Sequence, residues 1–415
     1  MPDSHRVAFD WSHATAAQRN TLWAAGLGWM LDAFDVLLYS LVLTRLITEL
    51  GMSKATAGLL NSLTLVASAV GSIVIGVLAD RYGRRRMLSA SILIYSLFSF
   101  ACGLARSVFM LALFRFGLGA GMGGEWNSGA AMVAEAWPTE RRGRAMGLVQ
   151  SSWAVGYALA AAVAGFLLPR TSWRMVFFVG VVPALLTLWI RRSVPETAPP
   201  PVTADPFRVR FRAAWSGRRH AVLALLAMNT CGMFAWWGLF TWLPAYLELP
   251  LAQGGRGFQL LGTTQLLVLL NLCGMLPGYL VFGVLADRFG RKPTLVAYLA
   301  AAALLVPVFA AARTPFGILV TGGSVAFFGT GFFTGSGIIG SELFPAAIRA
   351  TALGLTYTGA RGLSALAPVV IGRLAERRGL SYAFGASGIS FALAALAALT
   401  LPETRGGEAS ASAAR

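Results

Sequence analysis

Apolar runs long enough to cross a lipid bilayer recur along the whole chain. A membrane-spanning helix needs about 20 predominantly apolar residues, and the sequence contains twelve such runs. They cover residues 20–43, 55–79, 87–105, 108–135, 144–168, 172–191, 219–247, 260–285, 294–312, 315–341, 350–372 and 381–401. In lipid each span must satisfy its own backbone hydrogen bonds, which favours helices, and the runs lack the polar–apolar alternation of barrel strands. The sequence therefore predicts an all-α integral membrane protein with twelve transmembrane helices.

The distribution of basic residues predicts the orientation of these spans. The chain has 34 basic residues and a formal net charge of +17, which raises the question of a nucleic-acid partner. If the N-terminus is cytoplasmic, 22 of the basic residues lie in cytoplasmic tails and loops, ten in the opposite loops and two inside spans. This bias follows the positive-inside rule and accounts for the charge without a nucleic acid. We expect a multi-pass protein of a bacterial inner membrane with both termini in the cytoplasm.

A short charged phrase occurs twice, as GVLADRYGRR from Gly76 and GVLADRFGRK from Gly283. Other landmarks repeat at the same offset of 207 residues, so the chain is predicted to be a duplicated six-span unit. The expected organisation is a cytoplasmic tail (1–19), a first six-helix bundle (20–197), a cytoplasmic linker (198–218), a second six-helix bundle (219–404) and a cytoplasmic tail (405–415). Parallel halves related by an axis along the membrane normal are typical of alternating-access transporters. Because one chain contains both halves, we expect a monomer.

The repeated loops carry a resemblance to a known family. The doubled phrase, together with AEAWPTERRGRAMG and SELFPAAIRATALG, resembles the loop motifs of the major facilitator superfamily over essentially the whole chain. In that family the loops hold the two halves together on the cytoplasmic side while the protein opens outward. The resemblance thus implies gating roles for Asp80, Arg81, Gly83, Arg84, Glu135, Arg142, Asp287, Arg288, Gly290, Arg291, Glu342 and Arg349. The alternative is that the arginines only fix the topology.

Few charged residues lie inside the predicted spans. Each costs about 2.5–3.5 kcal/mol at a helix centre, so each needs a partner or a water-filled cavity. Asp35 and Arg115 are predicted at similar depths, where they can form an ion pair. Segments of spans 1 and 4 resemble those of the proton symporters of organic acids, in which such a pair is the proton switch. The candidates for proton coupling are Asp32, Asp35, Glu125 and Arg115, and the alternative is a permanently charged structural pair.

Arg361 lies at the middle of span 11 and is the only ionisable residue deep in the second half. No carboxylate of that half is available to it, and a guanidinium binds a carboxylate in bidentate fashion. We therefore predict that Arg361 anchors an anionic substrate; the alternative is pairing with an acid of the first half across the cavity. Further candidates for the cavity wall are Asn127, Gln150, Trp153, Tyr157, Asn229, Trp236, Trp237, Gln265, Asn271 and Tyr357. Trp242 and Tyr246 are expected to be anchors at the membrane interface.

These observations predict a secondary active transporter rather than an enzyme. The sequence has no nucleophile–base constellation, no metal-ligand cluster and no nucleotide loop, so we expect no cofactor beyond the coupling protons. The leading hypothesis is proton-coupled import of a small organic anion, a mono- or aromatic carboxylate, by alternating access. The alternatives are a porter of an uncharged sugar, a drug or metabolite exporter, and a transporter-like sensor.

Overall fold

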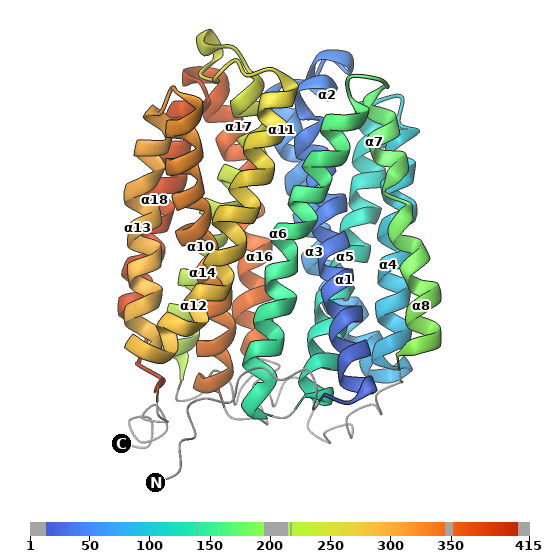
Figure 1. The fold of residues 1–415 in the computed structure, drawn as a ribbon, viewed down its shortest axis with the longest axis vertical. Coiled ribbons are helices and arrows are strands. Elements are labelled where there is room, and N and C mark those ends of the chain that lie inside the picture. Colours follow the sequence, from blue (N-terminus) through green and yellow to red (C-terminus); the bar gives the residue numbers. More distant parts are fainter. Residues whose placement is uncertain (1–13, 138, 195–214, 216–217, 345–351, 406–415) are drawn as a thin grey trace.

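The computed structural model describes residues 14–137, 139–194, 215, 218–344 and 352–405, with the backbone alone for helix residues 80, 127, 130, 131, 134, 135, 139–144 and 191. The described secondary structure is entirely helical (Figure 1). The first half contains α1 (Ala16–Leu41), α2 (Leu43–Glu49), α3 (Lys54–Tyr82), α4 (Arg84–Gly103), α5 (Val108–Ala136), α6 (Thr139–Leu167), α7 (Trp173–Val179), η2 (Val182–Leu185) and α8 (Leu186–Ser193). The second half contains α10 (Arg219–Glu248), η3 (Leu251–Gln253), α11 (Leu260–Leu269), η4 (Leu270–Met275), α12 (Leu276–Phe289), α13 (Arg291–Ala311), α14 (Pro315–Leu343), η5 (Gly354–Thr358), α16 (Gly359–Ser364), α17 (Ala367–Arg378) and α18 (Leu380–Leu399).

The predicted spans coincide with these helices. Among the described residues, ten helices are long and apolar enough to cross a membrane, with α7, η2 and α8 together forming one of them. The other two predicted runs are helical as well: α5 has 29 residues, and η5, α16 and α17 follow one another in the eleventh run. The all-α transmembrane fold is therefore confirmed. Helix ends differ from the predicted ends by several residues because polar caps and loops, rather than hydropathy, set them.

The doubled phrase forms a tight turn in each half. Gly83 alone separates α3 from α4 and has φ 99°, and Gly290 alone separates α12 from α13 and has φ 107°. Residues with a Cβ rarely adopt these angles, which explains why glycine occupies this place in both copies. We call the end of the molecule with these two turns the motif end, and the other end the far end; they lie at the bottom and the top of Figure 1.

The eighth and eleventh spans are irregular where they cross the molecule. In each of them a π-helical turn replaces regular α-helix, η4 in the eighth span and η5 in the eleventh. Such turns leave some backbone groups without their usual partner and are frequent at functional sites. Tyr357 belongs to η5, and Arg361 follows one turn later in α16.

The two halves meet closely at the far end. Ala55 N donates to Glu376 Oε1 over 2.7 Å, and Thr44 Oγ1 donates to Glu248 Oε2 over 2.6 Å. Gly58 of α3 packs so tightly on α17 that a Cβ on it would lie 2.3 Å from the carbonyl oxygen of Pro368. At the motif end, the described ion pairs join residues of the second half to one another. The structure is thus closed at the far end.

This close approach predicts that Gly58→Ala will open the far end. A methyl group 2.3 Å from a backbone oxygen forces the halves apart, and overpacking of this kind costs about 1–3 kcal/mol. We expect the ratio of open to closed molecules to rise about 5- to 150-fold. Spin labels on Thr48→Cys and Gln253→Cys, which are exposed positions of the two halves at the far end, report the distance between the halves.

The matched control is Gly385→Ala in α18, where a Cβ would meet nothing within 4 Å. This variant is expected to keep the parent distance distribution. If Gly58→Ala also keeps that distribution, the contact between α3 and α17 does not limit opening.

Candidate functional site

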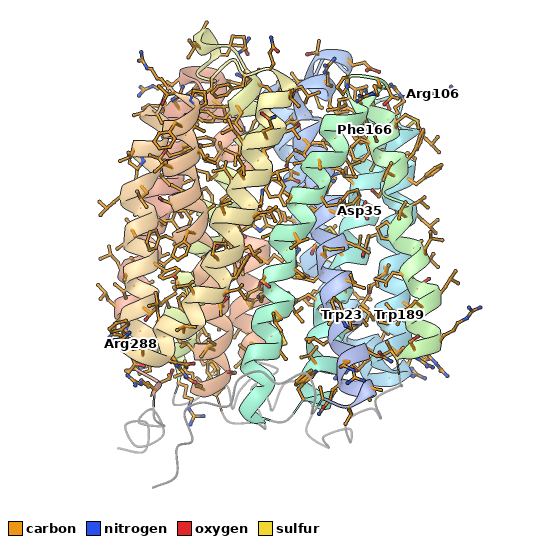
Figure 2. The ribbon with its side chains drawn as sticks, viewed as in Figure 1. Trp23, Asp35, Arg106, Phe166, Trp189 and Arg288 are labelled. Atoms are coloured by element: carbon orange, nitrogen blue, oxygen red, sulfur yellow. The ribbon has the colours of Figure 1, made fainter. Side chains whose placement is uncertain are left out.

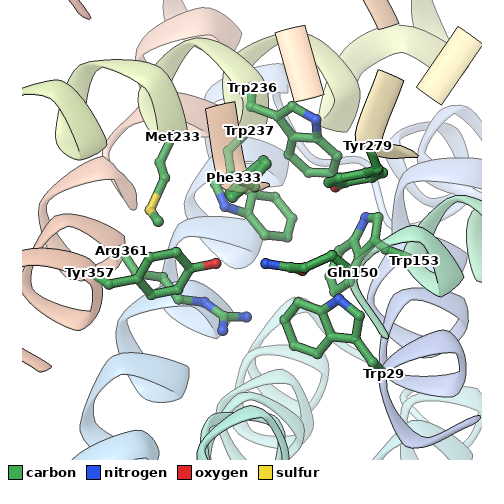
Figure 3. A pocket seen from close by; sticks show the side chains of 10 residues that line it. All are labelled: Trp29, Gln150, Trp153, Met233, Trp236, Trp237, Tyr279, Phe333, Tyr357 and Arg361. Carbon is green, nitrogen blue, oxygen red and sulfur yellow. The ribbon is translucent and has the colours of Figure 1, made fainter. Parts of the chain in front are cut away.

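A pocket lies between the two halves near the middle of the molecule (Figure 3). Its wall combines side chains from α1 and α6 of the first half with side chains from α10, α12, α14, η5 and α16 of the second. The lining residues are Trp29, Gln150, Trp153, Met233, Trp236, Trp237, Tyr279, Phe333, Tyr357 and Arg361. In this conformation they leave little free volume between them. A substrate larger than water therefore needs the halves to move apart.

Three polar groups point into a pocket whose other lining residues are mostly aromatic. Figure 3 shows the guanidinium of Arg361, the hydroxyl of Tyr357 and the amide of Gln150 directed toward the same space. The amide of Gln150 and the hydroxyl of Tyr357 point toward each other across the interface between the halves. Arg361 is 6% exposed, and its Nε and Nη2 atoms have no hydrogen-bond partner. The guanidinium therefore has free donors where an anion can reach them.

Aromatic rings form the walls around these polar groups. Trp29 packs against Trp153 with ring centroids 4.7 Å apart, and Trp153 lies 6.0 Å from Trp236. Trp236 and Trp237 meet edge to face at 4.9 Å. Large aromatic faces at such distances hold planar, partly apolar groups by offset or edge-to-face packing. The arrangement suits a flat ring or a conjugated chain that carries one charged end.

Arg361 faces two buried carboxylates of the first half. Asp32 is fully buried and Glu125 is 1% exposed, and the charge of Arg361 acts on both. Glu125 Oε1 lies against Gly28, where a Cβ would come within 2.5 Å of it. No ion pair within 4 Å joins these carboxylates to Arg361 in the part of the chain described, and both oxygens of Asp32 lack a hydrogen-bond partner. The geometry thus allows both hypotheses for Arg361, as a substrate anchor and as a partner of these acids.

The expected ion pair between Asp35 and Arg115 is absent. Both residues are fully buried, and Figure 2 shows Asp35 inside the first half. Arg115 Nη2 instead donates to Asn61 Oδ1 over 2.8 Å, while Asp35 Oδ1 accepts from Ser99 Oγ over 2.7 Å. The guanidinium also stacks on the ring of Tyr39, with its carbon 4.4 Å from the ring centroid. These alternative partners explain how the two charges lie near each other without contact.

Other residues proposed for the cavity wall lie away from the pocket. Asn229 Nδ2 donates to the carbonyl of Thr356 over 3.2 Å, and Asn271 Nδ2 donates to the carbonyl of Leu267 over 2.8 Å. Gln265 is exposed on α11, so the prediction that it lines the cavity is wrong. Tyr157 is buried and donates to the carbonyl of Phe240 over 3.3 Å. The side chain of Asn127 is outside the described residues.

The expected interfacial anchors are also wrong. Trp242 and Tyr246 are fully buried. Trp242 Nε1 donates to the carbonyl of Pro368 over 2.9 Å, and the Tyr246 hydroxyl lies 3.3 Å from the carbonyl oxygen of Ala310. Both side chains use their polar atom to join helices within the second half, which a position near the end of a span does not reveal.

Sequence reasoning missed Asn61 and four of the ten residues that line the pocket. The missed lining residues are Trp29, Met233, Tyr279 and Phe333. Trp29 precedes Asp32 by three residues and therefore shares its helix face, a signal that was available. Asn61, a polar side chain inside an apolar span, was a second available signal. Met233 and Phe333 are apolar residues in apolar helices, and nothing local distinguishes them.

Charged residues at the motif end form a cluster within the second half. Arg291 pairs with Asp287 and, with Nη2 3.3 Å from Oε1, with Glu342. Glu342 Oε2 also accepts from Thr404 Oγ1 over 2.5 Å. Figure 2 shows Arg288 at this end, where its carbonyl accepts from Arg405 Nη1 over 2.8 Å. These contacts tie α12, α13, α14 and the segment after α18 into one unit.

Glu403 fixes the start of α13 in this cluster. Its carboxylate accepts from the backbone N–H groups of Arg291 and Lys292, over 2.9 and 3.1 Å, at a helix N-terminus that favours negative charge. Burial alone raises the pKa of Glu403, but the backbone N–H groups together hold it below its usual range.

The remaining gating candidates belong to the first half, except Arg349 of the second. Arg81 is exposed on α3, with its guanidinium carbon 5.4 Å from the ring centroid of Tyr82. The side chains of Asp80, Glu135 and Arg142 are outside the described residues, as is Arg349. Arg84 follows the turn at Gly83 as the first residue of α4.

Comparisons with known proteins agree with this architecture. The sequence model of the Major Facilitator Superfamily matches residues 25–259 and 255–415. The chain is 34% identical to a probable 4-methylmuconolactone transporter of Cupriavidus pinatubonensis, over 96% of this chain and 94% of that protein. It is 32% identical to the niacin transporter NiaP of Acinetobacter baylyi, over 84% and 85% of the two chains. The solved structure of a D-xylose–proton symporter superimposes with a TM-score of 0.74 at 20% identity and covers 94% of this chain and 99% of its own.

Proposed function

Because this chain belongs to the Major Facilitator Superfamily and is a membrane transporter related to carriers of organic acids, we propose that it imports a small carboxylate together with protons. The substrate is a mono- or aromatic carboxylate, bound between the halves and exposed to each side of the membrane in turn. The observation that carries this proposal is the free guanidinium of Arg361 among aromatic walls.

The pocket chemistry matches an acid with a flat ring. Arg361 offers unpaired donors to a carboxylate, which binds a guanidinium through two parallel hydrogen bonds. The indoles of Trp29 and Trp153 offer faces to a ring, and the pair formed by Gln150 and Tyr357 offers contacts to a polar ring substituent. Niacin and methylmuconolactone each carry a ring and a carboxylic acid, which supports the same class of substrate for this chain.

Buried acids beside the anchor give a route for proton coupling. When Asp32 and Glu125 are ionised, they compete with a substrate carboxylate for Arg361. A proton on either acid weakens this competition and lets Arg361 bind the substrate. Substrate and proton then enter together, and an inward proton gradient drives accumulation.

The orientation follows from the basic loops. By the positive-inside rule we expect the motif end and both termini on the cytoplasmic side and the far end outside. The closed far end then corresponds to a molecule that is closed toward the outside. The motif-end residues act as the cytoplasmic gate when the molecule opens outward, and the cluster around Arg291 moves as part of the second half.

Uptake into proteoliposomes tests this function. A panel of radiolabelled acids would include nicotinate, benzoate and muconate, with xylose as a neutral compound. We expect at least one ring carboxylate to accumulate only under an inward proton gradient, and xylose to be excluded. Transport of xylose instead of the acids would overturn the choice of substrate, and accumulation without a response to the gradient would overturn symport.

A further inference from the structure

A buried hydrogen-bonded chain connects a cation of the first half to the second half. Arg115 Nη2 donates to Asn61 Oδ1 over 2.8 Å, and Asn61 Nδ2 donates to Thr241 Oγ1 over 2.9 Å. Each of the three side chains is at most 1% exposed. Arg115 and Asn61 belong to α5 and α3, whereas Thr241 belongs to α10. One amide thus joins the buried guanidinium to the opposite half.

Arg115 has donor atoms, and Asp35 an acceptor atom, that make no hydrogen bond. Nε and Nη1 of Arg115 have no partner, and neither does Oδ2 of Asp35. Their charges act on each other although no N···O distance within 4 Å is found between them in the described chain. A movement of one side chain can therefore exchange the Arg115–Asn61 bond for an Arg115–Asp35 pair. The observed separation is the arrangement expected with a proton on Asp35, because an ionised carboxylate and a guanidinium buried side by side without pairing would leave two uncompensated charges.

The Asn61–Thr241 bond lies toward the closed end. Asn61 is in the second turn of α3 from the far end, and Thr241 is at the matching height of α10. The structure describes several hydrogen bonds between the halves. In the Asn61–Thr241 bond, the donor side chain, Asn61, also accepts a hydrogen bond from Arg115. The contacts from Ala55 to Glu376 and from Tyr157 to Phe240 have no such link.

We propose that Asn61 is a positioning residue that transmits the charge state of Asp35 to the contact between the halves. When Asp35 is protonated, Arg115 binds Asn61 and orients its amide toward Thr241, which keeps the far end closed. When Asp35 ionises, Arg115 turns to it, the amide loses its fixed orientation, and the far end opens. The proton binds to and leaves the carboxylate of Asp35. This mechanism rests on the proton coupling proposed above and separates Asp35 from Asp32, which faces Arg361.

The surroundings of Asp35 identify the groups that can influence this switch. The titratable neighbours whose charges act on it or on Arg115 are Asp32 and Tyr39 from α1, Tyr95 and Cys102 from α4, and Arg115 from α5. From the sixth span, Gly180 lies against the carboxylate without a side chain, since a Cβ there would come within 2.4 Å of Oδ1. Tyrosine and cysteine side chains are ordinarily neutral at neutral pH, so the groups here that can carry a charge are the carboxylates of Asp32 and Asp35 and the guanidinium of Arg115.

The distance between the halves at the far end tests the proposal. Spin labels on Thr48→Cys and Gln253→Cys are measured at a series of pH values, in a background in which the three native cysteines are replaced by alanine. The parent is expected to be closed at low pH and to open as the pH rises. Asp35→Asn is expected to stay closed throughout. Thr241→Val, which keeps the shape but removes the acceptor, is expected to lower the ratio of closed to open molecules at low pH at least fivefold and to flatten the pH dependence.

Two further variants distinguish the proposed role of Asn61 from a general weakening of the packing between the halves. Thr241→Ser restores the hydroxyl and is expected to restore the pH response. Tyr157→Phe removes a neighbouring hydrogen bond to α10 that has no link to Arg115, and is expected to keep that response. The proposal is overturned if the parent distance does not depend on pH, if Thr241→Val keeps the parent response, or if Tyr157→Phe flattens it equally.

The test does not depend on the identity of the substrate. Arg361→Lys is expected to impair carboxylate binding while the distance still changes with pH. If the substrate is not a carboxylate, the pH dependence of the far-end distance can still be observed. If that distance does not depend on pH, carboxylate uptake still tests the proposed function separately.

Discussion

Replacing Arg361 with lysine is expected to weaken substrate binding about 10- to 150-fold. Lysine keeps the positive charge but cannot form two parallel hydrogen bonds with a carboxylate. Loss of a hydrogen bond to a charged group costs about 1.5–3 kcal/mol, and each 1.4 kcal/mol corresponds to a tenfold change in affinity. Because Trp29, Trp153, Trp236 and Trp237 line the pocket, quenching of tryptophan fluorescence by the ligand measures the dissociation constant directly.

A matched arginine controls for the substitution itself. Arg373 lies exposed on α17, in the same span as Arg361 but outside the pocket. Arg373→Lys is expected to leave the dissociation constant unchanged. If Arg361→Lys also leaves the dissociation constant unchanged, Arg361 does not bind the substrate through two parallel hydrogen bonds. The guanidinium then interacts with the neighbouring acids, Asp32 and Glu125, instead.

The features that the sequence predicted correctly are those that a bilayer or a local backbone angle imposes. A span must be helical and about 20 residues long whatever it packs against, so α3 and α14 could be read from hydropathy. The turns at Gly83 and Gly290 follow from one backbone angle and a repeated phrase. Arg361 could be identified as a candidate site residue because a charge inside an apolar span is costly and needs a partner or a water-filled cavity.

The features that the sequence did not predict depend on which way a side chain points and on which neighbour it meets. Gln265 and Asn271 are both polar residues of the eighth span, but one is exposed and the other is buried. A span that is apolar on all sides has no periodicity that tells these faces apart. The sequence predicted Asp35 as the partner of Arg115, but the structure shows Asn61 instead. The two candidate partners lie at similar depths, so the sequence alone does not distinguish them. Only the arrangement of α1, α3 and α5 decides between them.

Asp32→Asn is expected to abolish accumulation driven by a proton gradient while exchange of labelled for unlabelled substrate continues. Asparagine has nearly the same shape as a protonated aspartate but cannot release a proton, so substrate transport is no longer coupled to the proton gradient. A gradient of one pH unit is worth about 1.4 kcal/mol per proton and supports about tenfold accumulation. The variant should reduce this ratio to about one. Exchange needs no net proton movement, and it should persist because Arg361 remains free to bind the substrate.

The two assays together distinguish a proton carrier from a structural acid. Glu49→Gln makes the same type of change at the far end, where Glu49 pairs with Arg174 at the surface, and this control should accumulate substrate like the parent. Loss of both accumulation and exchange in Asp32→Asn would mean that the buried carboxylate maintains the pocket rather than carrying a proton. Retention of both would transfer the coupling role to Glu125, the other acid on which Arg361 acts. Glu125→Gln should then show the pattern expected here for Asp32→Asn, because a single protonatable group beside the anchor is enough to link one proton to one carboxylate.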